Sequence, residues 1–258
     1  MGTMNKAQSP ASLIPRGAAH PQSALQDLFM LQSWTFLSFA HVDAVVRKLR
    51  PGSCVMSIGG GTGLLTDRVL SYRYPGIRFV GTDLRPASFD HAVLPANLVV
   101  RSIDICAVRG SFDFDLVYSV ECLEHIEDDR LAVENMLSFL RPGGSLMAIV
   151  PFSPQEDRHD TRRLEEEQRR HGHVRLGYDP DDLKRLVDAR SFSEVRLESC
   201  YWSHSAQLRK YKETVVPTLG AAVFHHLEIL ARQDIQIARL AKSRAEAVGL
   251  KLLAIGKQ

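Results

Sequence analysis

The stretch VMSIGGGTGL, residues 55–64, decides the fold. An apolar run suited to a buried strand leads into four glycines within residues 59–63, and a helical pattern follows. Glycine permits a tight turn and lets a ligand approach the backbone, because no Cβ stands in the way. Open α/β sheets bind their ligands at the carboxyl ends of strands, where turns of this kind lie. The stretch therefore predicts a strand–turn–helix unit with a nucleotide-type ligand site.

On both sides of this stretch, short apolar segments alternate with helical patterns. Strands are predicted at residues 54–58, 77–83, 97–104, 114–120, 145–152, 193–202 and 250–257. Helices are predicted at residues 64–72, 130–140 and 179–189, and the run RPGG at 141–144 is expected to separate a helix from the strand after it. Such alternation indicates parallel βαβ units, so the fold class is α/β with a doubly wound, Rossmann-like sheet.

The chain is expected to hold a flexible leader at residues 1–22 and a single domain at 23–258. The predicted parts of that domain are N-terminal helices at 23–50, a ligand-binding core at 53–202, a helical insertion or lid at 203–247 and the last strand at 248–258. The apolar stripe of the insertion (Leu219, Val223, Leu227, Leu230) is expected in the core, with a lid or a homodimer contact as the alternatives.

Residues 155–173 are dense in charges of both signs. They suit a solvated helix with ion pairs three and four residues apart, or a loop bordering a substrate, and the two interpretations are compatible.

The composition excludes several classes of protein. The 258 residues carry 32 basic and 30 acidic side chains, a net charge of +2, which is too balanced to indicate a nucleic-acid or membrane-surface partner. The four cysteines form no CxxC pair, so neither a disulfide scaffold nor a zinc cluster is predicted. We find no secretory signal and no apolar stretch long enough for a membrane span. The expectation is a soluble, reduced, cytoplasmic protein.

The glycine spacing separates two kinds of ligand site. A dinucleotide turn needs G-x-G-x-x-G, but Leu64 occupies the position of the third glycine, and a nicotinamide oxidoreductase is therefore disfavoured. Further polar residues follow the next strands: Asp83 ends the second, where a carboxylate can accept both hydroxyls of a ribose. Asp104–Ile105 follows the third, where it can meet an adenine edge.

With these features, the chain resembles the class I S-adenosylmethionine-dependent methyltransferases. The turn at residues 58–63, the run FDLVYSVECLEH at 114–125 and the run LRPGGSL at 140–146 follow the order and spacing of that family. The resemblance covers about residues 50–200. It implies a Rossmann-like sheet, mostly parallel with an antiparallel last strand and helical cap elements, and S-adenosylmethionine as cofactor, with S-adenosylhomocysteine as product.

The resemblance also implies the members of the cofactor site. They are Ser57, Gly59, Gly61, Gly63, Asp83, Leu84, Asp104, Ile105, Ser119 and Val120. The glycines would face the methionine and ribose portions of the cofactor, Asp83 would bind the ribose, and Leu84 would pack on the adenine. Asp104–Ile105 would lie at the adenine edge, and Ser119–Val120 would line the floor below the sulfonium.

Ser57 departs from the family pattern, which has an acidic residue at this position. In the family that carboxylate orders the methionine end of the cofactor, and a serine hydroxyl replaces only part of its bonding. Two hypotheses follow: an O- or N-methyltransferase, and a non-catalytic S-adenosylmethionine-binding partner subunit of a methyltransferase or biosynthetic complex.

The acceptor is expected to be a small molecule bearing a hydroxyl or an amine: a sugar, a glycan precursor or a secondary metabolite of natural product biosynthesis. The chain has YSVE at residues 118–121, not the N/D-P-P-Y tetrad that holds a planar amide or exocyclic amine, and no basic stripe indicates nucleic acid. A hydroxyl acceptor calls for a general base near neutral pKa, and His173 and His125 are the candidates. No metal is expected, because the sequence assigns no carboxylate or cysteine partner to the His-x-His pair at 171–173.

Overall fold

The computed structural model describes residues 33–61, 64–86, 94–187, 192–200 and 249–256. The predicted leader at 1–22 and insertion at 203–247 lie outside these residues, as does Gly63. In the described part of the chain, no helix is both long enough and apolar enough to span a membrane.

Seven strands form one sheet in the order β3-β2-β1-β4-β5-β7-β6. Their bounds are β1 Cys54–Ile58, β2 Arg78–Asp83, β3 Leu98–Ser102, β4 Phe114–Val120, β5 Leu140–Pro151, β6 Phe192–Cys200 and β7 Gly249–Gly256. The first five strands pair in parallel, and β7 pairs antiparallel with both β5 and β6. The strand order reverses direction between β1 and β4, which is where an open sheet of this kind forms its ligand crevice. The predicted doubly wound sheet with an antiparallel last strand is confirmed.

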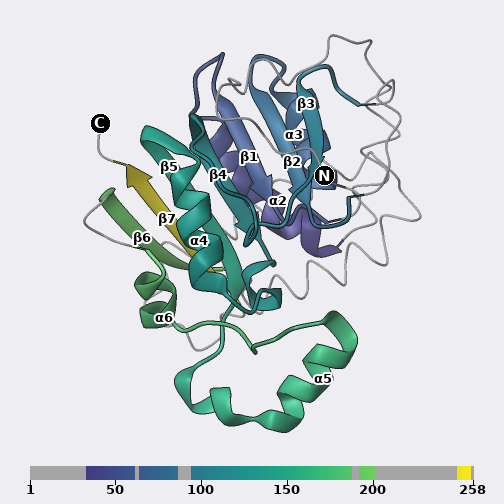
Figure 1. The fold of residues 1–258 in the computed structure, drawn as a ribbon, viewed down its shortest axis with the longest axis vertical. Helices are drawn as coiled ribbons and strands as arrows, with labels where there is room; N and C mark the ends of the chain where they lie inside the picture. The colour runs from purple at the N-terminus through teal and green to yellow at the C-terminus, as the bar shows by residue number, and fades with distance from the viewer. Residues whose placement is uncertain (1–32, 62–63, 87–93, 188–191, 201–248, 257–258) are drawn as a thin grey trace.

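Helices cover both faces of the sheet (Figure 1), and the two faces have separate apolar clusters. Helices α2 (Ser33–Val46) and α3 (Leu65–Arg73) pack on one face, against residues such as Val55 and Phe79. Helices α4 (Asp129–Ser138) and α6 (Pro180–Arg185) pack on the other. All five residues of β1 are buried because the strand is central and covered on both sides, which explains its continuous apolar run.

The charged run forms a short 3₁₀ helix, η4 (Gln155–His159), and the helix α5 (Thr161–His171). The Asp160 side chain caps α5 by accepting a hydrogen bond from the Arg163 amide, and Gly172 ends the helix with a left-handed φ of 79°. Figure 1 shows α5 beyond the carboxyl-terminal ends of β4 and β5. The predicted ion pairs are present, for example Arg170 with Glu166 four residues earlier.

The run RPGG does not separate a helix from a strand as predicted, because β5 already begins at Leu140. Leu140 pairs with Phe114, and the next pairing joins Ser145 to Leu116, so residues 141–144 form an irregularity inside the strand. Gly144 is required there, since a Cβ on it would lie 2.8 Å from the Phe114 carbonyl oxygen. Helix α4 accordingly ends at Ser138 and not at residue 140.

Candidate active site

The glycine turn fits between two neighbouring segments. Gly59 has a left-handed φ of 68°, and a Cβ on it would lie 2.2 Å from the Cys122 sulfur, in the segment that follows β4. A Cβ on Gly60 would lie 2.4 Å from the Leu64 side chain. Around a Cβ on Gly61, in contrast, there is open space. Packing against Cys122 therefore requires the first glycine, the second lies against the ends of the Leu64 and Asp67 side chains, and the third leaves room for a ligand.

Asp83 joins the end of β2 to this turn. One of its carboxylate oxygens accepts a hydrogen bond from the Gly61 amide at 3.0 Å, and the other accepts one from the Arg85 amide at 2.9 Å. Each oxygen keeps a second lone pair for a ligand hydroxyl. The next residue, Leu84, is 55% exposed, and no other large apolar side chain in the described residues is as exposed. An acceptor pair and an apolar surface thus lie side by side.

Asp104 and Ile105 follow β3. The Asp104 carboxylate accepts a hydrogen bond from the Cys106 amide at 2.9 Å, which closes a local turn. The Ile105 side chain is buried in the apolar cluster around α4, and its carbonyl oxygen accepts a hydrogen bond from the Asn135 side chain. Both residues thus have structural contacts within the protein.

A cavity of about 200 Å³ opens between the glycine turn and the end of β4. The residues that line it are Ser38, Ile58, Gly59, Gly60, Gly61, Thr66, Asp67, Tyr118, Val120 and Glu121. Val120 is therefore at the cavity, as predicted for the floor of the site, while its neighbour Ser119 is buried beside it with a hydroxyl that has no described hydrogen-bond partner.

Asp67, on α3, supplies the buried carboxylate that β1 lacks. Ser57 is occupied with β2, since its hydroxyl accepts a hydrogen bond from the Thr82 amide and its carbonyl oxygen accepts one from the Thr82 hydroxyl. One Asp67 oxygen accepts a hydrogen bond from the Tyr118 hydroxyl at 2.8 Å. The other oxygen lies beside the Ser57 hydroxyl, which lowers the pKa of Asp67, and 2.9 Å from the place of a Gly60 Cβ, directly behind the turn.

Burial raises the pKa of Asp67 to about 6, against the opposing effect of the Tyr118 and Ser57 hydroxyls. A cation at this end of the cavity would therefore meet a carboxyl group that is poised to ionise near neutral pH.

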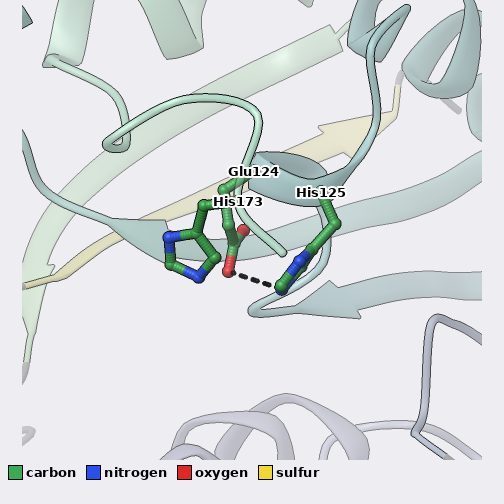
Figure 2. A group of neighbouring side chains, drawn as sticks. All are labelled: Glu124, His125 and His173. Atoms are coloured by element: carbon green, nitrogen blue, oxygen red, sulfur yellow. Dashed lines mark ion pairs between the residues drawn. The ribbon is translucent and has the colours of Figure 1, made fainter. Parts of the chain in front are cut away.

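The two candidate histidines lie together, around Glu124 (Figure 2). His125 ends the short 3₁₀ helix η3 (Leu123–His125), and its Nε2 is 3.8 Å from a Glu124 oxygen. His173 comes from the loop after α5, and its ring centroid is 4.7 Å from that of His125, with the planes nearly perpendicular. Burial, and then His125, lower the pKa of His173.

The segment after β4 carries two acidic side chains, of which Glu124 is buried and Glu121 is half-buried. Burial raises the pKa of Glu124 to about 7. Glu121, which lines the cavity, has its pKa raised well above the usual range by burial and by the charge of Glu124. Glu121 lines the cavity and Glu124 belongs to the histidine cluster, so the two sites are three residues apart along the chain.

Comparison with known proteins assigns the family. The profile of a methyltransferase domain matches residues 33–197, which is more than half of the chain. The chain belongs to this methyltransferase family. The assignment to the class I S-adenosylmethionine-dependent methyltransferases and to their cofactor is confirmed.

Curated relatives and solved structures of other proteins are similar to this methyltransferase. An uncharacterized methyltransferase of Mycobacterium tuberculosis is 34% identical over 119 residues, which cover 44% of this chain and 59% of that protein. A ubiquinone biosynthesis O-methyltransferase of Xanthomonas campestris is 30% identical over 118 residues, covering 43% and 48%. The chain thus spans less than two thirds of the length of these relatives.

The fold is shared with phosphoethanolamine N-methyltransferase 2 of Haemonchus contortus, solved with S-adenosyl-L-methionine. Its TM-score is 0.55 at 14% identity, and the alignment covers 92% of this chain and 60% of that one.

Sequence reasoning missed two acidic residues of this methyltransferase's site. Asp67 follows Leu64 by three residues and precedes Leu70 by three, a spacing that places it on the buried face of its helix. This spacing is the sequence signal that indicates the burial of Asp67. Glu124 has no comparable signal, because its burial depends on the loop at residues 172–175, which is distant in sequence.

The raised pKa of Asp67 predicts how stability depends on pH. The folded protein keeps this proton up to about pH 6, whereas the unfolded chain releases it near the ordinary aspartate pKa of 3.8. The folded state therefore binds more protons between these pH values, and stability falls as pH rises through this window. Relative to the Asp67→Asn variant, the wild type should lose about 2 kcal/mol between pH 4 and pH 7.

Denaturant unfolding of both proteins at several pH values measures this difference. Asp113→Asn, at an exposed site before β4, is the control and should parallel the wild type. A constant stability difference between the wild type and Asp67→Asn across the window would contradict the assignment.

Proposed function

We propose that this chain transfers the methyl group of S-adenosylmethionine to a hydroxyl or amine of a small molecule, with a hydroxyl as the favoured acceptor. The observation that carries the proposal is the cavity between the glycine turn and the end of β4, with Asp67 behind it and Asp83 at its side. The sulfonium of the cofactor already activates the methyl group, so the protein's task is to bind and align the two reactants.

In the proposed complex, the methionine end of the cofactor lies in the cavity toward Asp67, and the ribose hydroxyls donate to Asp83. The adenine packs on exposed Leu84, near Asp104–Ile105. The open space at Gly61 supports this placement because the backbone there can approach the cofactor closely.

The acceptor would lie on the side of Glu121, toward the cluster of Glu124, His125 and His173. A lone pair of the acceptor oxygen forms the new C–O bond. The methyl C–S bond breaks with its electron pair left on sulfur, which gives S-adenosylhomocysteine, and the hydroxyl proton leaves on the side of the cluster. A sugar, a glycan precursor or a secondary metabolite is the proposed acceptor class, and the likeness to a ubiquinone biosynthesis O-methyltransferase supports oxygen as the acceptor atom.

The non-catalytic alternative was motivated by Ser57 alone. Asp67 reaches the same turn from α3 and offers the carboxylate that β1 lacks, which removes that motive. We therefore favour an enzyme over a partner subunit.

The first experiment is calorimetric titration of the purified protein with S-adenosylmethionine and S-adenosylhomocysteine, followed by an acceptor screen that detects release of S-adenosylhomocysteine. Micromolar binding of both, with turnover of a hydroxyl acceptor, is the expected outcome. Saturable binding of NAD(P)H without any of S-adenosylmethionine would overturn the proposal.

The Asp83→Ala variant should bind S-adenosylmethionine at least tenfold more weakly, a loss of about 1.4 kcal/mol, because it loses charge-assisted hydrogen bonds to the ribose. Calorimetry measures the dissociation constant. Asp113→Ala, at the opposite end of β4, should leave it unchanged. An unchanged constant in a folded Asp83→Ala protein would remove Asp83 from the site.

Moving the carboxylate between α3 and β1 tests the role of Asp67. Asp67→Asn should weaken S-adenosylmethionine binding about tenfold or more, because the carboxylate facing the cationic end of the cofactor is lost. Adding Ser57→Asp to that variant should restore most of the affinity, since it returns a carboxylate to the same turn. Wild-type affinity in Asp67→Asn, or no recovery in the double variant, would count against this role.

His173→Ala should abolish turnover of an acceptor found in the screen and leave S-adenosylmethionine binding intact, because the side chain lies on the acceptor side of the site. His159→Ala, at an exposed position of η4, is the matched control. Turnover at the wild-type rate in His173→Ala would exclude the residue from the reaction.

A further inference from the structure

Glu124, His125 and His173 form a cluster that binding of the cofactor does not require. One ligand atom of each side chain lies within 4.8 Å of those of the other two. Figure 2 shows the carboxylate between the two imidazoles, with a contact to His125. The sequence assigns no carboxylate partner to the His-x-His pair at 171–173, whereas the structure places Glu124 beside His173 and brings in His125 in place of His171.

The Glu124 carboxylate is buried and only partly compensated, by the charge of Arg175 and by the contact with His125 at 3.8 Å. Its side chain is 0% exposed, and among the described residues neither of its oxygens has a hydrogen-bond partner. An ionised carboxylate removed from water in this way costs several kcal/mol unless a cation or hydrogen-bond donors compensate it. Both oxygens are therefore available as ligand atoms on the side that faces the imidazoles.

A second carboxylate supports the orientation of His173. Glu167, on α5, places an oxygen 3.8 Å from the His173 Nδ1. Metal-binding histidines almost always direct their second ring nitrogen toward a carboxylate, a carbonyl or water, which fixes the tautomer and the direction of the ring. Glu167 is near enough to His173 Nδ1 for an ion pair, and it would have to approach further to make this hydrogen bond.

The two segments that carry the three side chains are held together by hydrogen bonds. The Val174 amide donates to the Glu124 carbonyl oxygen at 2.9 Å. The Arg175 guanidinium donates to the carbonyl oxygens of Leu123 and Ile126, both at 2.7 Å. These bonds hold the two segments together, and the three donor atoms lie within 4.8 Å of one another, so the side chains must close in to reach the distances of about 2.0–2.2 Å that a metal ion requires.

We propose that Glu124, His125 and His173 bind one divalent first-row transition cation, of the kind of Zn²⁺ or Co²⁺. Two imidazoles and one carboxylate are the donors of catalytic zinc sites and of related iron sites, whereas Mg²⁺ and Ca²⁺ prefer oxygen ligands alone. Three protein ligands also leave a coordination position open for a substrate oxygen.

This inference extends the proposed function to the way in which a hydroxyl acceptor is activated. A cation at this cluster would lower the pKa of an acceptor hydroxyl that binds it, so that the proton passes to solvent as the oxygen attacks the methyl group. The cation is not consumed, and the products stay the methylated acceptor, S-adenosylhomocysteine and a proton.

Binding of Co²⁺ to the tag-free, chelator-treated protein tests the site without cofactor or acceptor. The expected result is one equivalent bound per chain, with visible absorption bands of a coordinated ion, displaced by Zn²⁺ but not by excess Mg²⁺. Glu124→Gln and His173→Ala should each weaken binding at least tenfold. His171→Ala is the matched control, because this exposed neighbour belongs to the same His-x-His pair but not to the cluster.

Titration of each preparation with S-adenosylmethionine separates the two proposals. If the protein binds the cofactor but no metal, the metal site is overturned and the proposed function stands. If it binds metal but no cofactor, the proposed function is overturned. Equal Co²⁺ affinity in all variants, the same loss in His171→Ala, or displacement by Mg²⁺ would also overturn the site. If Glu124→Gln does not fold, the Co²⁺ affinity of His173→Ala is the deciding measurement, because this residue lies in a loop. Intact cofactor binding then shows that the His173→Ala protein is folded.

Discussion

The close approach of the segment after β4 to the backbone of Gly59 is the constraint on which the rest of the site depends. The Cys122 sulfur occupies the place where a Cβ on Gly59 would lie, so any side chain there would push the segment away. Leu64 and Asp67 press on Gly60 and on Gly81 from the side of α3 in the same way. The glycines thus allow the segment after β4 and helix α3 to pack closely against the turn. The ligand cavity is the space that this packing leaves between the turn and the end of β4.

This constraint also directs the chain after β4. Glu121 leaves the strand with a left-handed φ of 48°, a conformation that non-glycine residues adopt at some cost, and its amide donates to the Ile149 carbonyl oxygen of β5. The backbone bends there, and three residues later Glu124 points away from solvent. Arg175 and the Tyr178 hydroxyl both donate to the Leu123 carbonyl oxygen, which holds the short helix η3 in place from the other side.

Sequence patterns were sufficient for those parts of the site that depend on local chemistry. The strand–turn–helix unit, Asp83 at the end of β2 and the exposed Leu84 follow from residue type and position in the chain. Asp67 is not predicted because a charged residue on a helix is normally solvated; its spacing from Leu64 and Leu70 indicates the buried face, and the packing against Tyr118 and the turn confirms the burial. The strand irregularity at residues 141–144 was mistaken for a boundary because its glycines resemble a helix stop, whereas they admit the neighbouring backbone of β4.

The pairing of His173 with His125 could not be derived from sequence, since it depends on hydrogen bonds between segments about fifty residues apart. Once those bonds form, a single short segment carries both ends of the site: Val120 and Glu121 at the cavity, and Glu124 and His125 at the cluster. In the proposed complex, the backbone of this segment would set the distance between the methyl donor and a group on the acceptor side. Methyl transfer needs its reacting atoms about 3 Å apart and in line, so a rigid common segment is a direct way for this fold to meet that requirement.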